Sequence, residues 1–378
     1  MFFRDIIGQD KVKERLIKSV QEERISHAQL LSGPAGSGKL ALALAYAQYI
    51  SCRNRTVADS CGECPSCKKY AALSHPDLHF VFPIFKKGSS PSYCDDFLKP
   101  WREMLQKSGY FSLAQWQEHI NSENSQLVIY SHESESIIRK LNLKSFEAEY
   151  KTMIIWLPER MNAECANKLL KMIEEPPSKT LFLLVTEKEA DIIPTIRSRT
   201  QIIKVPKIAD NDLQDFLQKN SDYDPETIAE MVHYANGDYL RAVGYIETPE
   251  DKQYFFTLFQ QLMRTAYIAV KKTSEIGQVM EIADELASLG RERQKEFFRY
   301  AMHLTREFFV MNLQNPSLVY LSREEKEWGE KFARFINERN VIPLNNLLEK
   351  GHLHISRNGN AKIIFLDTAL SIIRLIRK

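Results

Sequence analysis

The sequence has no long apolar run. None of its 378 residues belong to an uncharged apolar stretch of about 18 or more, the minimum for a transmembrane helix. The most apolar segment, 361–376, is broken by Lys362, Asp367 and Arg374, which indicates an amphipathic helix. The first ten residues carry acids and lack the apolar centre of a secretory signal. We therefore expect a cytoplasmic protein with no membrane partner.

A strong excess of charge of one sign is also missing. Lys and Arg number 51 and Asp and Glu number 49, which gives a net charge of +2. Affinity for duplex DNA comes largely from phosphate neutralisation, so this balance argues against an autonomous, strongly basic DNA-binding protein. It is compatible with a subunit of a larger DNA machine. A hydrophobic content of 44% and a charged content of 26% are ordinary for globular proteins.

Apolar strands alternate with helices up to about residue 204, which is typical of a parallel sheet covered on both faces. The expected strands are Ala28–Leu31, Thr152–Leu157, Leu181–Thr186 and Gln201–Val205. Strand signals fade after Pro206, and the pattern is almost entirely helical from Pro249. We therefore expect an α/β domain over 1–204, a small helical lid over 205–246 and an all-α domain over 247–378.

A glycine-rich loop follows the first expected strand. Residues 33–40, with the letters G-P-A-G-S-G-K-L, fit the phosphate-binding pattern G-x-x-x-x-G-K-[ST] except at the last position. A strand before the loop and a helix after it distinguish this pattern from a chance glycine turn. The expected phosphate-binding residues are Gly33, Gly36, Gly38 and Lys39. Leu40, however, lacks the hydroxyl that binds Mg²⁺ at this position.

The acid that completes a magnesium–nucleotide site is missing as well. In P-loop NTPases an apolar strand ends in an acid that holds the metal. Here the strand runs into Trp156 and Leu157, and Glu159 comes two residues later, beyond Pro158. A shifted strand register is the alternative explanation. The pattern predicts a site without magnesium-dependent hydrolysis and leaves open whether the loop holds ATP or phosphate.

Four of the six cysteines lie within sixteen residues, at Cys52, Cys61, Cys64 and Cys67. In a reducing compartment such clustering indicates a metal site rather than a disulfide framework. Four thiolates fill the tetrahedral shell of zinc and leave no open position, so the expected zinc is structural. The alternative is a set of ordinary thiols, which is how we interpret the isolated Cys94 and Cys165.

Two arginine-bearing turns each have two interpretations. Arg197 and Arg199 follow the third expected strand, and exposed arginines are usually part of a solvated face. The sharper hypothesis is an arginine finger that one of them presents to the nucleotide of a neighbouring subunit. Arg241 begins a helix after Gly237, where it would either approach phosphate or serve as a capping or surface residue.

The segment 84–125 is rich in aromatic residues and contains scattered lysines. We expect a helical insertion that buries its own aromatic side chains, because aromatic residues are mostly found in cores. A basic and aromatic surface that binds nucleic acid is the alternative. The aromatic residues concerned are Trp101, Tyr110, Phe111 and Trp116.

Together these motifs resemble the clamp-loader branch of the AAA+ ATPases, found in the bacterial DNA polymerase III clamp-loader complex. In order they are F-R-D-I-I-G-Q at 3–9, the phosphate-binding loop, the four-cysteine module at 52–67, S-H-P-D at 74–77, A-N-K-L-L-K-x-I-E-E-P-P at 166–177 and I-R-S-R at 196–199. The resemblance covers roughly residues 1–245. It implies a RecA-like parallel sheet with flanking helices, a small helical lid and an all-α C-terminal oligomerisation collar.

Within this family the sequence is more similar to the non-hydrolysing delta-prime branch than to the gamma/tau ATPases, which are expected to keep a hydroxyl after the P-loop lysine and Asp-Glu after the apolar strand. The resemblance implies that Arg199 is the finger offered to ATP on a neighbouring gamma subunit. It also implies that the four cysteines are a zinc site and that Arg241 occupies the sensor-2 position, although there is no nucleotide hydrolysis here for it to sense.

The implied partners are the gamma/tau and delta subunits of a hetero-pentamer and, through the complex, the sliding clamp and primer–template DNA. We expect no ATPase activity from the chain by itself, only from the holoenzyme of which it is a component. Two alternatives stay open. One is an active gamma/tau-like ATPase in which Glu159 serves as the acid, and the other is a zinc-bearing nucleic-acid-binding protein with a vestigial P-loop.

Overall fold

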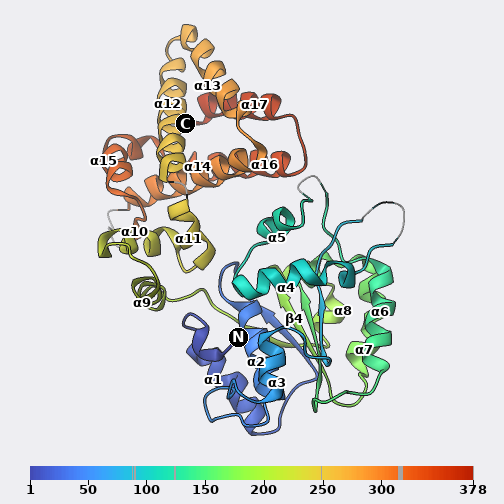
Figure 1. Cartoon of the computed structure of the whole chain (residues 1–378). Coiled ribbons are helices and arrows are strands. Elements are labelled where there is room, and N and C mark those ends of the chain that lie inside the picture. Colours follow the sequence, from blue (N-terminus) through green and yellow to red (C-terminus); the bar gives the residue numbers. More distant parts are fainter. Residues whose placement is uncertain (87, 89–90, 123–124, 248, 314–317, 378) are drawn as a thin grey trace. The chain divides into compact units, whose positions relative to one another are not determined.

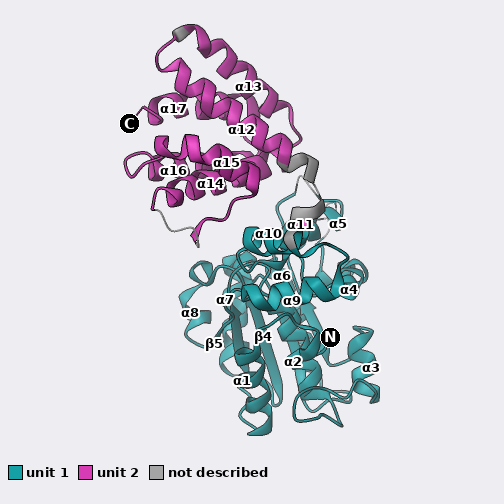
Figure 2. Cartoon of the chain, turned by 90° about the vertical axis from the view of Figure 1, so that its left-hand side faces the viewer, with its two compact units in different colours: residues 1–243 teal, residues 244–378 magenta. Residues whose placement is uncertain are grey.

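A computed structural model describes residues 1–378 except 87, 89–90, 123–124, 248, 314–317 and 378 (Figure 1). The chain divides into two compact units, Met1–Val243 and Gly244–Lys378 (Figure 2). The segment expected to form a lid lies almost wholly in the first unit. Its separation from the α/β part at residue 204 stays a prediction.

The first unit is built on a five-stranded sheet in which all neighbouring strands are parallel, in the order β2-β3-β4-β1-β5. The strands are β1 (Ala28–Ser32), β2 (Leu78–Val81), β3 (Lys151–Trp156), β4 (Thr180–Thr186) and β5 (Gln201–Lys204). This confirms the predicted parallel α/β sheet. We did not predict β2, because it has only four residues and one of them is His79.

The three central strands are buried at every position, as their apolar sequences require. In the register, Leu30 of β1 lies opposite both Leu184 of β4 and Ile202 of β5. Because the carboxyl ends of parallel strands meet at one edge, the loops that follow β1, β3 and β4 lie close together. The loop after β1 carries the glycine-rich segment, the loop after β3 carries the residues that follow Trp156, and the loop after β4 begins with Glu187.

Helices cover both faces of this sheet, with α2 on one side and α7 on the other (Figure 2). Every residue of α2 is buried, because its alternating Leu and Ala residues are apolar all round. The helices of this part are α1 (Asp10–Gln21), α2 (Lys39–Ser51), α3 (Pro65–Ala71), α4 (Leu98–Lys107), α5 (Leu113–His119), α6 (Ser131–Asn142), α7 (Ala163–Glu174) and α8 (Pro194–Arg197). The remaining helices of the first unit are α9 (Asp210–Asn220), α10 (Pro225–Ala235) and α11 (Tyr239–Glu247), the last of which crosses into the second unit.

The insertion between β2 and α6 is an aromatic core rather than an aromatic surface. Trp101 and Trp116 are both 0% exposed, and the indole N–H of Trp116 donates to the Pro83 carbonyl at 2.8 Å. Phe82 stacks on Trp101 with ring centroids 4.1 Å apart. The two indole rings are therefore buried, as expected, and not accessible to nucleic-acid bases, but Trp101 packs on residues outside the segment 84–125, namely Phe82 and Trp156.

The second unit contains helices and no strand among its described residues. Its helices are α12 (Pro249–Ala269), α13 (Ile276–Ser288), α14 (Arg291–Met311), α15 (Arg323–Phe332), α16 (Val341–Ser356) and α17 (Ala361–Leu375). Phenylalanines dominate its core, and the rings of Phe298 and Phe365 stack with centroids 4.7 Å apart. This agrees with the expected all-α C-terminal part. Across the described residues of both units, we find no helix with the length and apolar character needed to span a membrane.

Candidate functional site

The predicted phosphate-binding residues lie in one loop between β1 and α2. Gly36 and Gly38 have φ angles of +66° and +84°, which a residue with a side chain adopts only with strain. Gly33 lies so close to the neighbouring strand that a Cβ on it would be 2.0 Å from the Val205 carbonyl oxygen. Lys39 is the first residue of α2. The glycines are therefore required by the loop conformation itself, as well as by any anion it would bind.

The side chain of Lys39 is folded back on its own loop. It is only 5% exposed, and its ammonium group donates to the Pro34 carbonyl and to Ser37 Oγ. Burial lowers the pKa of Lys39, and the nearby carboxylates of Glu187 and Asp238 partly oppose that shift. The Lys39 ammonium group is thus hydrogen-bonded within its own loop.

The start of α11 closes one side of the glycine loop. A Cβ on Gly36 would lie 1.8 Å from Oδ1 of Asp238, and the Tyr239 amide donates to the Gly36 carbonyl at 3.4 Å. Asp238 also accepts from the Leu240 amide at 3.0 Å, and its Oδ2 lies 3.5 Å from Nε of Arg241. The structure therefore places Arg241 beside a carboxylate at the start of the helix, and its role towards phosphate stays a prediction.

Tyr110 closes a second side of the loop. A Cβ on Gly38 would lie 2.7 Å from the Tyr110 hydroxyl, which accepts a hydrogen bond from the Ile7 amide at 3.1 Å. The Tyr110 ring also packs edge-on against Tyr239, with centroids 4.9 Å apart, and burial raises the pKa of Tyr110 to about 12. The sequence places Tyr110 among the aromatic residues of the insertion and gives no sign of its contact with the loop.

The end of β3 offers no carboxylate to a metal ion. Trp156, its last residue, is 3% exposed and packs against Trp101 and Phe111 with ring centroids 5.3 and 5.1 Å away. Glu159 accepts hydrogen bonds from Thr186 Oγ1 at 2.8 Å and from the Glu187 amide at 3.0 Å. The carboxylate of Glu159 thus caps the end of β4.

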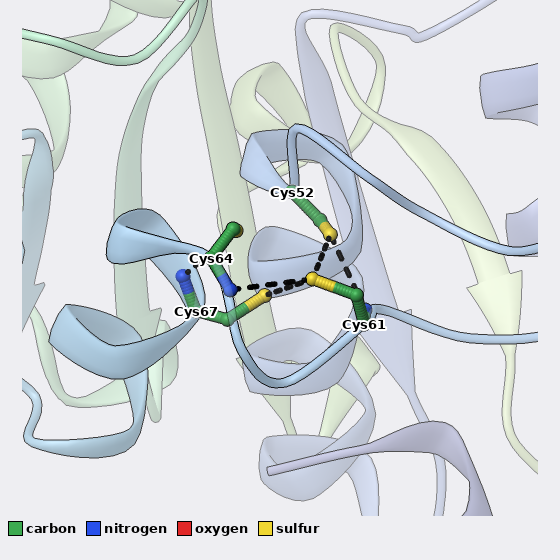
Figure 3. Close-up of side chains that lie close together, drawn as sticks. All are labelled: Cys52, Cys61, Cys64 and Cys67. Atoms are coloured by element: carbon green, nitrogen blue, oxygen red, sulfur yellow. Dashed lines mark hydrogen bonds between the residues drawn. The ribbon is translucent and has the colours of Figure 1, made fainter.

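The four predicted zinc ligands come together in space (Figure 3). All four Sγ atoms lie within 4.8 Å of one another, close to the sulfur–sulfur spacing of about 3.8 Å expected for tetrahedral Zn–S bonds of about 2.3 Å. Backbone N–H groups point at three of the sulfurs, as in the 3.3 Å contact from the Cys61 amide to Cys52 Sγ and the 3.4 Å contact from the Cys64 amide to Cys61 Sγ. Burial opposes ionisation of Cys64, yet hydrogen bonds from the Cys67 and Arg53 amides lower its pKa to about 6.

The donor set therefore fits a Zn²⁺ ion. Thiolates are the ligands that structural zinc prefers, and N–H···S contacts help to keep them ionised. The module is joined to the N-terminal segment, since the Asp59 carboxylate accepts from the Phe3 and Arg4 amides at 3.2 and 3.1 Å. An ion at this site would stabilise the connection between α2 and α3.

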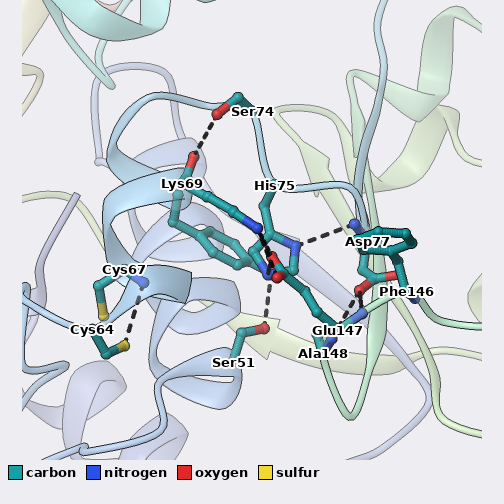
Figure 4. A network of polar contacts seen from close by, with 11 residues as sticks. Ser51, Cys64, Cys67, Lys69, Ser74, His75, Asp77, Phe146, Glu147 and Ala148 are labelled. Atoms are coloured by element: carbon teal, nitrogen blue, oxygen red, sulfur yellow. Dashed lines mark hydrogen bonds and ion pairs between the residues drawn. The ribbon is translucent and has the colours of Figure 1, made fainter.

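A buried polar network lies beside the cysteine module (Figure 4). The Asp77 carboxylate is 2% exposed and accepts from the amides of Phe146, Glu147 and Ala148 at 2.7, 2.9 and 2.8 Å. Lys69 of α3 donates to Glu147 at 2.7 Å. These contacts hold the segment before β3 in place, so the Asp of the S-H-P-D motif has a structural role.

Arg199 lies just after α8, away from the glycine loop in sequence. Its side chain is 35% exposed, and Nε lies 3.0 Å from Oε2 of Glu174 at the end of α7. Nη1 donates to the Thr195 carbonyl at 3.2 Å. Among the described residues, no hydrogen bond or ion pair joins the Arg199 side chain to the chain's own glycine loop.

Similarity to known proteins extends over about half of the chain. The sequence profile of the family described as "DNA polymerase III, delta subunit" matches residues 8–209, more than half of the chain. The chain belongs to the clamp-loader delta-prime family. The delta-prime subunit of DNA polymerase III from Bacillus subtilis (strain 168) is 29% identical over 212 residues, which is 55% of this chain and 51% of that protein. The tau subunit from the same organism is 26% identical over 199 residues, 53% of this chain and 28% of that protein.

The chain thus spans about half the length of the delta-prime relative that it matches. Among solved structures, a gamma-subunit-related protein of DNA polymerase III from Thermotoga maritima covers 98% of this chain and 100% of that chain, at 14% identity and a TM-score of 0.38. The AAA+ fold class that we predicted, a parallel sheet with flanking helices and a helical C-terminal part, is confirmed. Membership of the clamp-loader delta-prime family confirms the resemblance seen in the sequence.

Proposed function

We propose that this clamp-loader protein is a non-hydrolysing subunit that supplies Arg199 in trans to ATP bound by a neighbouring subunit. The proposal that the subunit does not hydrolyse ATP is supported by the packing around its glycine-rich loop and by the residue types at two positions. Asp238 and Tyr110 lie against its glycines, and Leu40 and Trp156 stand where magnesium ligands are needed. Without a divalent cation, the charge that develops on a transferred phosphoryl group is not neutralised.

Arg199 then acts on a neighbour's nucleotide rather than on one of its own. An arginine that reaches an adjacent ATP stabilises the transition state by roughly 10³–10⁵ in rate. The exposure of its side chain allows such an approach. The partners we propose are gamma/tau and delta subunits in a hetero-pentamer, which loads the sliding clamp onto primer–template DNA in the cytoplasm.

The cysteine module supplies rigidity to this subunit. We propose that Cys52, Cys61, Cys64 and Cys67 hold one structural Zn²⁺ ion, which cross-links α2 to α3 and takes no part in phosphoryl chemistry. The contacts of Asp59 and Asp77 extend that rigid region to the N-terminal segment and to the loop before β3. A rigid subunit keeps Arg199 at a fixed position relative to its neighbour.

The test is ATP turnover by a clamp-loader complex reconstituted from purified subunits. With Arg199→Ala we expect the rate of ATP turnover to fall at least about 100-fold, because an arginine finger contributes a large factor to that rate. Arg197→Ala, at an exposed arginine two residues away, is the matched control and should leave turnover unchanged. The purified chain alone should hydrolyse no ATP. Turnover by the chain alone that disappears in Lys39→Ala would instead support a gamma/tau-like motor, and tight, salt-resistant binding to bare DNA would support a nucleic-acid-binding protein.

A further inference from the structure

The guanidinium group of Arg199 is already held by a second residue of the same chain. Its Nε lies 3.0 Å from the Glu174 carboxylate, and its Nη1 donates to the Thr195 carbonyl. We infer that Glu174 is a positioning residue for Arg199, which holds the guanidinium in the orientation that a neighbouring subunit meets. The inference rests on the proposed function of Arg199 as an arginine finger.

The backbone that carries Glu174 is fixed. Glu174 is the last residue of α7, and the preceding residue, Ile173, is 0% exposed. The Ile173 carbonyl accepts a hydrogen bond from Nε2 of His27 at 3.0 Å, which anchors the last helical turn to the segment before β1. The carboxylate of Glu174 thus projects from a rigid point, although its own side chain is 55% exposed.

A carboxylate in this position does not help the helix. The C-terminal end of a helix carries partial negative charge, so a negative side chain there is unfavourable by itself. The Arg199 guanidinium offsets that repulsion. The electrostatic benefit of Glu174 therefore lies in its contact with Arg199 rather than in the stability of α7.

The backbone around Arg199 is also fixed, which leaves only its side chain to be oriented. The Arg199 amide donates to the Ile196 carbonyl at 3.1 Å, and the next residue, Thr200, is buried. The two contacts at Nε and Nη1 set the plane of the guanidinium. Within the described part of the chain no group hydrogen-bonds to Nη2, so that nitrogen is available to an oxygen of a phosphate on another subunit.

An ordinary surface ion pair would give a different experimental result. Exposed pairs contribute little to folding stability, so loss of Glu174 should leave the melting temperature nearly unchanged. A positioning residue instead acts on the rate, because a poorly oriented catalytic group lowers turnover even when folding is intact. The two roles are therefore separated by kinetics, not by stability.

The experiment measures steady-state ATP hydrolysis by the reconstituted complex with Glu174→Ala, Arg199→Ala and both changes together. We expect Glu174→Ala to lower kcat about fivefold with little change in KM, because the contact matters in the transition state. It should have no further effect in the Arg199→Ala background, since it acts through that side chain. Glu174→Asp should restore part of the rate, and Glu175→Ala, at the exposed neighbouring acid, is the matched control.

The outcomes separate this inference from the proposed function. If Arg199→Ala leaves the complex fully active, the finger itself is wrong, and the positioning role falls with it. If Arg199→Ala lowers turnover while Glu174→Ala does not, or if the two effects multiply independently, only the positioning role is overturned. Thermal unfolding of each variant chain checks that the fold is kept, and Glu174→Gln replaces Glu174→Ala if the alanine variant unfolds early.

Discussion

The indole ring of Trp156 packs against that of Trp101, with ring centroids 5.3 Å apart. Trp156 ends β3, at the position where a P-loop NTPase needs an acid, and Trp101 belongs to the insertion between β2 and α6. The insertion thus packs against the end of β3, and an aromatic ring stands at the position where that acid would be.

An acid introduced at this position should destabilise the protein instead of restoring a metal site. Trp156→Asp buries a carboxylate and leaves a cavity beside Trp101, and we expect a loss of about 4 kcal/mol or more in the free energy of unfolding. Trp156→Phe keeps an aromatic ring and should cost about 1–2 kcal/mol. Urea unfolding measures both, and a Trp156→Asp variant as stable as the wild type would show that this space is not tightly packed.

The contact between Asp238 and Gly36 gives a second prediction. Gly36→Ala would combine a positive φ with a Cβ only 1.8 Å from the Asp238 carboxylate. We expect a loss of about 2–3 kcal/mol and faster amide exchange at the start of α11. Gly88→Ala is the control, because Gly88 has a φ of +70° with nothing within 4 Å of a Cβ. Equal losses in the two variants would mean that α11 is not held against the loop.

Removal of one cysteine tests the metal site. We expect the purified protein to contain about one zinc ion per chain, and Cys64→Ser to lose it, because three remaining thiolates do not complete the tetrahedral shell. Chelation should lower the melting temperature of the wild type to that of the variant. Cys165→Ala, at a buried cysteine outside the cluster, should keep its zinc. Metal analysis that finds no zinc in protein prepared with zinc present would contradict the assignment.

His79 should make folding sensitive to mild acid. Burial, together with the nearby Lys140 ammonium, lowers the pKa of His79 to about 4, whereas a histidine in an unfolded chain titrates near about 6.5. Between these values the unfolded state binds a proton that the folded state does not, so stability falls as the pH drops from about 6.5 to about 4. Above about pH 6.5 His79 is neutral in both states, and the free energy of unfolding no longer depends on its protonation.

The variant His79→Gln removes this titration. Relative to the wild type, its free energy of unfolding should therefore improve as the pH is lowered from about 7 to about 5, which urea unfolding at each pH measures. A His79→Gln variant whose stability runs parallel to the wild type across this range would show that His79 is protonated equally in both states.

Some features of the fold and site depend on residues that are close together in the sequence, and these could be predicted from it. The strand, glycine loop and helix at 28–51 form one continuous segment. The cysteine cluster spans 52–67, and its short spacing already restricts the four sulfurs to one neighbourhood. The missing ligands at Leu40 and Trp156 follow from residue type alone, because neither side chain offers an oxygen atom to a metal ion.

The remaining features come from pairs of residues that are far apart in the chain. Tyr110 accepts from the amide of Ile7, which is 103 residues away, and Asp77 accepts from that of Glu147, 70 residues away. No local periodicity encodes such pairs, since they form only when the sheet and its insertion pack together. The sequence by itself determined the α/β framework, the cysteine module and the side chains without oxygen at positions 40 and 156. Tertiary packing alone decided that Asp238 and Tyr110 lie against the glycine loop and that Glu174 pairs with Arg199. These side chains belong to separate elements, which come into contact only when the helices pack on the sheet.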